Sequence, residues 1–257
     1  MILAIDAGNT NVVFALFEEG KIRAQWRSAH EPHRTADEYA VWLTHLMALE
    51  GLAPSDVEAA VMANVVPASQ HNLERLCKRY FDCAVLNVGR DGVGLGIKVL
   101  TDNPKEVGAD RLVNAVAAHE SYGGPVIIID FGTATTFDII NGEGNYIGGI
   151  IAPGMDLSLE ALYMAAAKLP LIAVEQPEKI IGTNTVSAMQ SGIFWGYVSL
   201  VEGMVARIRA EFGEEMKVVA TGGLSGLLAR ATDVIETSDK DMTLRGLYSI
   251  YKRNKKQ

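Results

Sequence analysis

The chain has 257 residues, of which 49% are hydrophobic and 21% are charged. A chain of this length forms one large domain or two smaller ones, and it buries enough surface to fold without a disulfide or a structural metal. The 23 basic and 31 acidic residues give a net charge of −8. This charge argues against a protein that binds nucleic acid, and its overall field repels anionic ligands. Any anionic ligand must therefore be attracted by local groups.

Cysteine usage and hydropathy indicate the cellular compartment of the protein. Cys77 and Cys83 lack the paired spacing of a zinc or redox site, so we interpret them as small buried side chains in a reducing cytosol. Asp6 interrupts the first apolar run before a signal-peptide core can form. No later stretch reaches the roughly 18 apolar residues that a membrane span requires. These features predict a cytoplasmic protein.

A strand, a glycine turn and a returning strand occur twice. Residues 2–5 form an apolar run that leads through a turn into residues 12–17, and residues 126–129 lead likewise into residues 137–140. The matching positions, each pair 124 residues apart, are Asp6 and Asp130, Gly8 and Gly132, Glu19 and Glu143, and Gly20 and Gly144. Equal spacing without a gap predicts two halves built on one plan, each opening with a hairpin.

The segments after each hairpin alternate between helical and strand patterns. Thr35 and Glu38 have the spacing of a capping box, which predicts a helix ending near Gly51. Pro104 suits a helix start, although Gly108 delays that start by up to a turn. Further strands are predicted over residues 57–65, 85–88 and 217–220, and further helices over residues 73–80, from 156 and over 185–212. The alternation indicates an α/β protein.

The two hairpin turns have the chemistry of a phosphate site. A carboxylate at the end of a buried strand can hold Mg²⁺, while turn N–H groups and hydroxyls face phosphates. Asp and Gly are ordinary turn residues, so a single such turn is explained by structure alone. Two turns at matching positions indicate instead that Asp6 and Asp130 approach one nucleotide from opposite sides.

The duplicated Asp-Gly hairpins resemble those of the acetate kinase, sugar kinase, heat-shock 70 and actin superfamily. Thr221, Gly222 and Gly223, which follow an apolar strand, look like the adenosine-binding turn of that superfamily. The resemblance implies two related ribonuclease H-like, or actin-like ATPase, domains with mixed sheets and flanking helices. Residues 1–121 and 122–257 would form these domains, with a nucleotide cleft between them.

Five segments in order narrow the resemblance to the type III pantothenate kinases. They are residues 6–11 (DAGNTN), 108–111 (GADR), 130–136 (DFGTATT), 148–154 (GGIIAPG) and 182–192, which runs from GTNT to QSG. The resemblance covers nearly the whole chain. It implies ATP-dependent phosphorylation of pantothenate to 4'-phosphopantothenate, the first step of coenzyme A biosynthesis, by a homodimer that uses Mg²⁺ and a monovalent cation, K⁺ or NH₄⁺.

The resemblance also implies roles for individual residues. Asp110 would be the proton acceptor, Asp130 the ligand of the monovalent cation and Asp6 a ligand of Mg²⁺. The ATP-binding residues would be Asp6, Ala7, Gly8, Asn9, Thr10, Asn11, Val12, Val13 and Thr133. The pantothenate-binding residues would be Gly108, Ala109, Asp110, Arg111 and Thr185, the last contributed by the neighbouring subunit.

The chemistry of Asp110 and Arg111 agrees with this implication. A guanidinium can form a charge-assisted bond to a carboxylate, which pantothenate carries, and the aspartate can accept a proton from the attacking hydroxyl or orient it. Taken alone, the two residues are better explained as a surface pair at a helix start. The tyrosine that many members carry before the GADR segment is absent, since residues 99–102 read VLTD.

Three hypotheses follow from the sequence. The first is a pantothenate kinase, and the second keeps the fold but phosphorylates a sugar or another small hydroxyl compound, which the missing tyrosine favours. The third is a nucleotide-binding protein without catalytic activity, against which the complete set of Asp6, Asp110, Arg111 and Asp130 argues. The five histidines are interpreted as structural or solvated. Gly192, Gly196 and Gly203 are predicted to allow close helix contact, as at a dimer interface.

Overall fold

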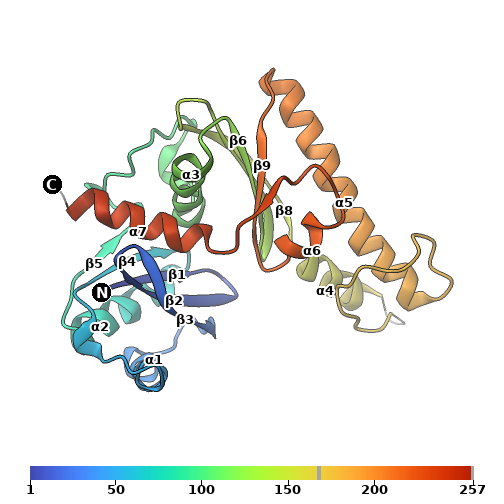
Figure 1. Ribbon diagram of the computed structural model, residues 1–257. Helices are drawn as coiled ribbons and strands as arrows, with labels where there is room; N and C mark the ends of the chain where they lie inside the picture. Colours follow the sequence, from blue (N-terminus) through green and yellow to red (C-terminus); the bar gives the residue numbers. More distant parts are fainter. Residues whose placement is uncertain (167–168, 256–257) are drawn as a thin grey trace. The chain divides into compact units, whose positions relative to one another are not determined.

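The computed structural model describes residues 1–166 and 169–255, which divide into two compact units. The first unit contains residues 1–120 together with residues 241–257, and the second contains residues 121–240 (Figure 1). The sequence places a domain boundary after residue 121, and the first compact unit gives way to the second after residue 120. The assignment of the last 17 residues to the second domain differs from the structure, because the C-terminal helix packs against the first sheet.

The first unit is built on a five-stranded sheet in the order β3-β2-β1-β4-β5. Strands β1 and β2 are antiparallel, as are β2 and β3, whereas β4 runs parallel to β1 and β5 runs parallel to β4. The bounds are β1 Ile2–Ala7, β2 Asn11–Glu18, β3 Lys21–Ala29, β4 Ala59–Asn64 and β5 Val85–Asn87. This mixed sheet is what the resemblance implied.

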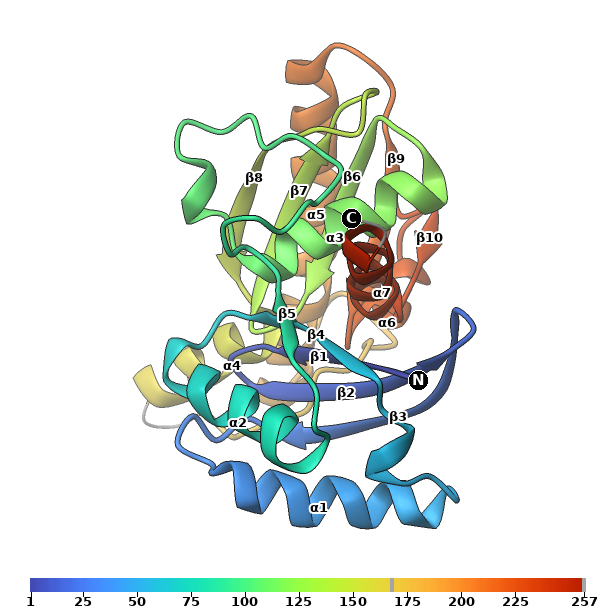
Figure 2. The ribbon, with the colours of Figure 1, turned by 90° about the vertical axis from the view of Figure 1, so that its left-hand side faces the viewer.

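Helices cover both faces of the first sheet (Figure 2). Leu3 and Ile5 pack on the side of α1 (Ala36–Leu49) and α2 (Gln70–Tyr80). Ile2 and Ala4 point to the other face, where they meet α3 (Ala109–Tyr122) and α7 (Met242–Lys255). The alternation along β1 explains why its apolar run is continuous, since both faces are buried.

Glycine allows α7 to approach α3 closely within the first unit. A Cβ atom added to Gly246 would lie 2.7 Å from Cγ1 of Val113, which is too close for a side chain. Short 3₁₀ turns connect the other elements of the unit, at Pro54–Asp56, Pro67–Ser69 and Pro104–Glu106. Pro104 therefore begins a short turn, and α3 itself starts only after Gly108, as the sequence allowed.

The second unit repeats the plan with the strand order β10-β9-β6-β7-β8. Its strands are β6 Val126–Phe131, β7 Ala134–Ile140, β8 Tyr146–Pro153, β9 Lys217–Gly222 and β10 Thr237–Ser238. Its helices are α4 Met155–Ala165, α5 Thr185–Phe212 and α6 Ser225–Ala229. Residues of α5 and β6 share one apolar core on a face of this sheet.

The two hairpins correspond less closely than their equal spacing suggested. Ala7 pairs with Val12 across the first turn, whereas Phe131 pairs with Thr135 across the second, so the second turn is one residue shorter. The β7–β8 connection is longer than the β2–β3 connection, which restores the spacing. The prediction of a gapless repeat is therefore wrong in detail, because two compensating changes of loop length leave the later offset unchanged.

Local signals at other element ends behave as predicted. The Thr35 hydroxyl accepts a hydrogen bond from the backbone N–H of Glu38 at 3.3 Å, and the Thr35 N–H donates to the Glu38 carboxylate at 2.8 Å, which completes the capping box of α1. Cys77 and Cys83 are both free and buried. Within the described residues, no helix is both long and apolar enough to cross a membrane.

Candidate active site

The first hairpin places a carboxylate beside an exposed turn. Asp6, the last residue but one of β1, is half-buried between Val13 on β2 and Ala63 on β4. The Gly8 N–H donates to the carbonyl oxygen of Asn11 at 3.0 Å and closes the turn. The turn residues between them are exposed. The arrangement puts a carboxylate and a set of backbone groups at one end of the sheet.

The second hairpin places Asp130 in the equivalent position. Asp130 is half-buried on β6, between Thr136 on β7 and Thr221 on β9. The Gly132 N–H donates to the carbonyl oxygen of Ala134 at 3.1 Å, and Thr133 next to it is exposed. Each unit therefore carries the same combination of strand, carboxylate and glycine turn.

The predicted nucleoside turn lies directly against Asp130 in the second unit. Gly222 ends β9 with a φ of +88°, a left-handed conformation that favours glycine. A Cβ atom at Gly222 would lie 2.6 Å from Oδ1 of Asp130 and 2.5 Å from the carbonyl oxygen of Phe131. Only glycine lets the two strand ends approach this closely. A Cβ atom at the neighbouring Gly223 would meet nothing within 4 Å.

Asp110 lies in the first turn of α3 in the first unit. Its Oδ1 accepts a hydrogen bond from the backbone N–H of Arg111 at 2.8 Å. Burial raises the pKa of the Asp110 carboxyl, and the N–H and guanidinium of Arg111 oppose that rise only in part. A carboxylate in this environment is a better proton acceptor than one in water, which suits a general base.

The glycine before Asp110 has a steric role. A Cβ atom at Gly108 would lie 2.5 Å from Oδ1 of Asp110 and 3.7 Å from Cγ1 of Val65. Val65, which follows β4, donates its N–H to the carbonyl oxygen of Ala7 at 3.1 Å. Val65 thus connects the end of the first hairpin to the Asp110 segment. From the sequence, Val65 is predicted only to lie in a buried strand. No local pattern reveals its contact with Gly108, which is 43 residues away in the chain.

The predicted site residues divide between the two units. Residues 6–13 and 108–111 belong to the first unit, and Asp130, Thr133 and Thr185 belong to the second. Thr185 is exposed at the first position of α5, where Asn184 caps the helix by accepting a hydrogen bond from the N–H of Ser187 at 2.9 Å.

The donor set fits a magnesium ion that is held mainly by its substrate. The described residues contain no group of three or more His, Cys, Asp or Glu side chains able to hold a metal ion. Mg²⁺ in kinases is bound by one or two carboxylates together with substrate phosphates and water, and a strand-end carboxylate such as Asp6 meets that requirement.

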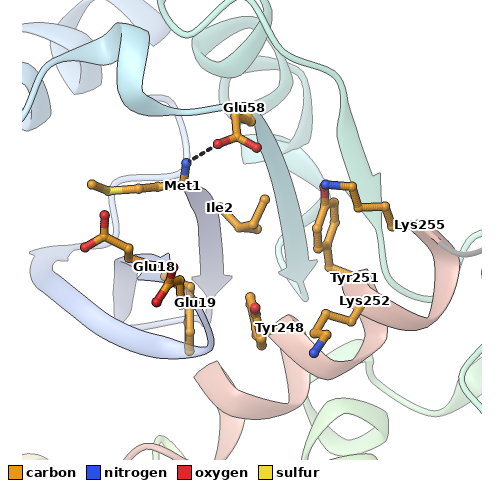
Figure 3. Close-up of a pocket in the computed structure, with 10 residues that line it drawn as sticks. Met1, Ile2, Glu18, Glu19, Glu58, Tyr248, Tyr251, Lys252 and Lys255 are labelled. Carbon is orange, nitrogen blue, oxygen red and sulfur yellow. Dashed lines mark hydrogen bonds and ion pairs between the residues drawn. The ribbon is translucent and has the colours of Figure 1, made fainter.

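A separate pocket in the first unit lies away from these residues. Its volume is about 390 Å³, and it lies between the start of β1, the β2–β3 turn and α7 (Figure 3). The lining includes Glu19, Glu58, Tyr248 and Lys252, and it contains none of the predicted ATP-binding or pantothenate-binding residues.

Comparison with known proteins decides the family. The sequence model of the type III pantothenate kinases matches residues 2–207. The chain belongs to the type III pantothenate kinase family. The type III pantothenate kinase of Paramagnetospirillum magneticum is 59% identical over 254 residues, which cover 99% of this chain and 98% of the relative. That of Caulobacter vibrioides is 54% identical over 256 residues, which cover 99% of this chain and 98% of the relative.

Two solved structures of similar fold carry descriptions other than pantothenate kinase. A putative Baf family transcriptional activator from Campylobacter jejuni matches with a TM-score of 0.61 and 20% identity, covering 99% of this chain and 100% of the other. A putative 2-dehydro-3-deoxygalactonokinase from Sinorhizobium meliloti matches with a TM-score of 0.58 and 15% identity, covering 98% and 96%. These similarities support the fold alone. Type III pantothenate kinases use ATP to phosphorylate pantothenate in coenzyme A biosynthesis.

The contact between Gly222 and Asp130 leads to a stability prediction for this pantothenate kinase. We expect Gly222→Ala to lower the free energy of unfolding by about 1–3 kcal/mol, because the methyl group clashes with backbone and the left-handed φ is strained. Gly223→Ala is the matched control, and it should change stability by less than about 0.5 kcal/mol. Urea denaturation of both variants measures the difference. Equal stability of the two variants would show that the strand ends are not packed as described.

Proposed function

We propose that this chain phosphorylates the primary hydroxyl of pantothenate with ATP and that Asp110 is the general base. The observation that carries the role of Asp110 is its position at the start of α3, where burial raises the pKa of its carboxyl. The proton of the attacking hydroxyl passes to this carboxylate as the oxygen attacks the γ-phosphorus, and the bond from that phosphorus to the β–γ bridging oxygen breaks, so that ADP leaves. Because phosphoryl-transfer transition states are loose, positioning of the hydroxyl contributes more than strong basicity.

The pantothenate-binding residues of the proposal are Gly108, Ala109, Asp110 and Arg111, with Thr185. Arg111 binds the carboxylate of pantothenate through a charge-assisted hydrogen bond. The close approach of the Gly108 backbone to Oδ1 of Asp110 supports this assignment, since it fixes the carboxylate relative to the segment that holds the substrate.

The ATP-binding residues of the proposal are those of the two hairpins, at positions 6–13 and at Thr133. Asp6 is the protein ligand for Mg²⁺, which when bound neutralises part of the phosphate charge. Exposed turn residues beside a half-buried carboxylate support this assignment. Local N–H groups and the ion provide the attraction that the net charge of −8 does not.

Asp130 is the proposed ligand of a monovalent cation, K⁺ or NH₄⁺. The carboxylate is half-buried and in close contact with Gly222, so it sits where β6 and β9 end together. A single negative charge among backbone carbonyls and hydroxyls suits a weakly hydrated monovalent ion.

A homodimer is the proposed assembly. Large apolar side chains of the second unit are exposed on β8, on α4, in the described residues between α4 and α5, and at the start of α5. They are Ile151, Leu157, Leu162, Tyr163, Met164, Leu171, Ile180, Ile181 and Val186. Soluble monomers seldom expose many large apolar side chains, and a second copy of the chain would cover them. Thr185 lies at the start of α5, which agrees with its proposed contact across the dimer.

The decisive assay for this function measures ADP release with ATP, Mg²⁺, K⁺ and pantothenate. We expect release that depends on pantothenate and falls when Na⁺ replaces K⁺. A sugar panel in place of pantothenate tests the second acceptor class, and nucleotide binding without turnover of any acceptor would support the non-catalytic hypothesis. Folded protein that shows no pantothenate-dependent release contradicts the proposal.

Replacing the proposed base should separate turnover from binding. We expect Asp110→Asn to lower kcat by about 10²–10⁴-fold while ATP still binds, because the amide cannot accept the proton. Asp102→Asn, an exposed residue of the preceding loop, is the control and should keep full activity. In the unsubstituted protein, kcat/KM should fall as pH decreases, at a pKa above that of an ordinary aspartate. Turnover by Asp110→Asn above one-tenth of the parent's would exclude this role.

The exposed apolar side chains of the second unit predict the state of assembly. Ile181 is 78% exposed within one chain, so Ile181→Glu leaves the monomer fold intact but places a charge in the proposed interface. We expect this variant to sediment as a monomer and the parent as a dimer. Val41→Glu on α1, which is 75% exposed in the first unit, is the control. A dimer that survives Ile181→Glu would place the interface elsewhere.

A further inference from the structure

His30 contacts the turn of the first hairpin at two points. It follows β3, whose last residue, Ala29, pairs with Asn11. The backbone N–H of His30 donates to the carbonyl oxygen of Thr10 at 2.8 Å. Its imidazole Nδ1 forms a hydrogen bond with the carbonyl oxygen of Gly8. One residue therefore binds two carbonyl groups of the same turn.

These two bonds determine where the turn directs its N–H groups. In a trans peptide the carbonyl and the following N–H point in opposite directions. Because the carbonyl of Gly8 points toward the imidazole, the N–H of Asn9 points away from it. By the same reasoning the N–H of Asn11 points away from the backbone of His30. The N–H groups of Asn9 and Asn11 thus each face away from the part of His30 that binds the preceding carbonyl.

The contact also determines which ring nitrogen carries a proton. A carbonyl oxygen only accepts hydrogen bonds, so Nδ1 must carry the proton. Nε2 is buried and has no hydrogen-bond partner in the part of the chain that the structure describes.

The segment that carries His30 is itself held in place. The N–H of Arg34 donates to the carbonyl oxygen of Glu31 at 2.9 Å, and the Arg34 guanidinium hydrogen-bonds the hydroxyl of Ser28. The same guanidinium lies 4.7 Å from the ring centroid of Tyr39 on α1. The imidazole is therefore attached to a rigid part of the first unit.

We propose that His30 is a positioning residue for the ATP phosphates, acting through the carbonyl of Gly8 to hold the turn N–H groups toward the nucleotide. This inference rests on the proposed function, because it requires that the first hairpin binds ATP. From the sequence, His30 is interpreted as structural or solvated, because nothing in the residues around it indicates the contact with Gly8.

A matched pair of substitutions tests the hydrogen bond itself. Asn and Leu have nearly the same shape, but only Asn can place an N–H near the position of Nδ1. Loss of one such bond reduces affinity by up to about tenfold. We expect His30→Leu to raise the KM for ATP by about that factor and to leave the KM for pantothenate within about twofold, while His30→Asn restores most of the ATP affinity.

Further arms of the experiment cover folding and specificity. Titration with a non-hydrolysable ATP analogue, without pantothenate, should show the same order of affinity. His33→Leu, at an exposed position of the same loop, should match the parent. If His30→Leu does not fold, His30→Gln takes its place, because its longer side chain puts the amide beyond the position of Nδ1.

The outcomes are separable. Inactive parent protein contradicts the proposed function. An active parent with unchanged ATP affinity in His30→Leu or His30→Gln overturns the role of His30, as does an equal loss of affinity for ATP and for pantothenate.

Discussion

In each unit an aspartate lies near the end of a strand that is paired on both sides, and the proposed site depends on this placement. β1 lies between β2 and β4, and β6 lies between β7 and β9, so the backbone groups of both strands are used by the sheet almost to their ends. Groups that can meet a ligand become available only where the pairing stops. Asp6 and Asp130 stand at that point, and the proposed chemistry of each unit is confined to the turns and helix starts around them.

The features predicted from the sequence are those with a local physical cause. The capping box at Thr35 depends on two residues three positions apart. The strands on either side of the first turn are visible in the sequence as apolar runs. β3 and β8 were not predicted. β3 alternates half-buried with exposed positions, and β8 contains Gly148 and Gly149, which lower its strand propensity. The place of α7 was also missed, because packing of a C-terminal helix on an N-terminal sheet leaves no trace in a short window.

The candidate site shows the same division. Asp6, Asp110 and Asp130 were found because carboxylates beside glycines are visible in the sequence and occur in a recognisable order. Val65 and His30 were not, since each matters through one contact with a residue distant in the chain. Gly222 was noticed as a turn residue, but the reason for glycine there, the closeness of Asp130, required coordinates. Sequence thus supplied the proposed reactive groups, and the structure added the residues that contact them.

The packing of α7 has a consequence for how the chain is made. The second unit is in effect an insertion, at residues 121–240, within the chain of the first. Leu244, Leu247 and Ile250 belong to the apolar core that includes Ile2 and Ala4, so only α3 covers this face of the first sheet until α7 has been synthesised. The inserted unit is a continuous segment and can fold while that face is still only partly covered. The unit that is translated first is therefore the last to be completed, and part of its apolar face is exposed until then.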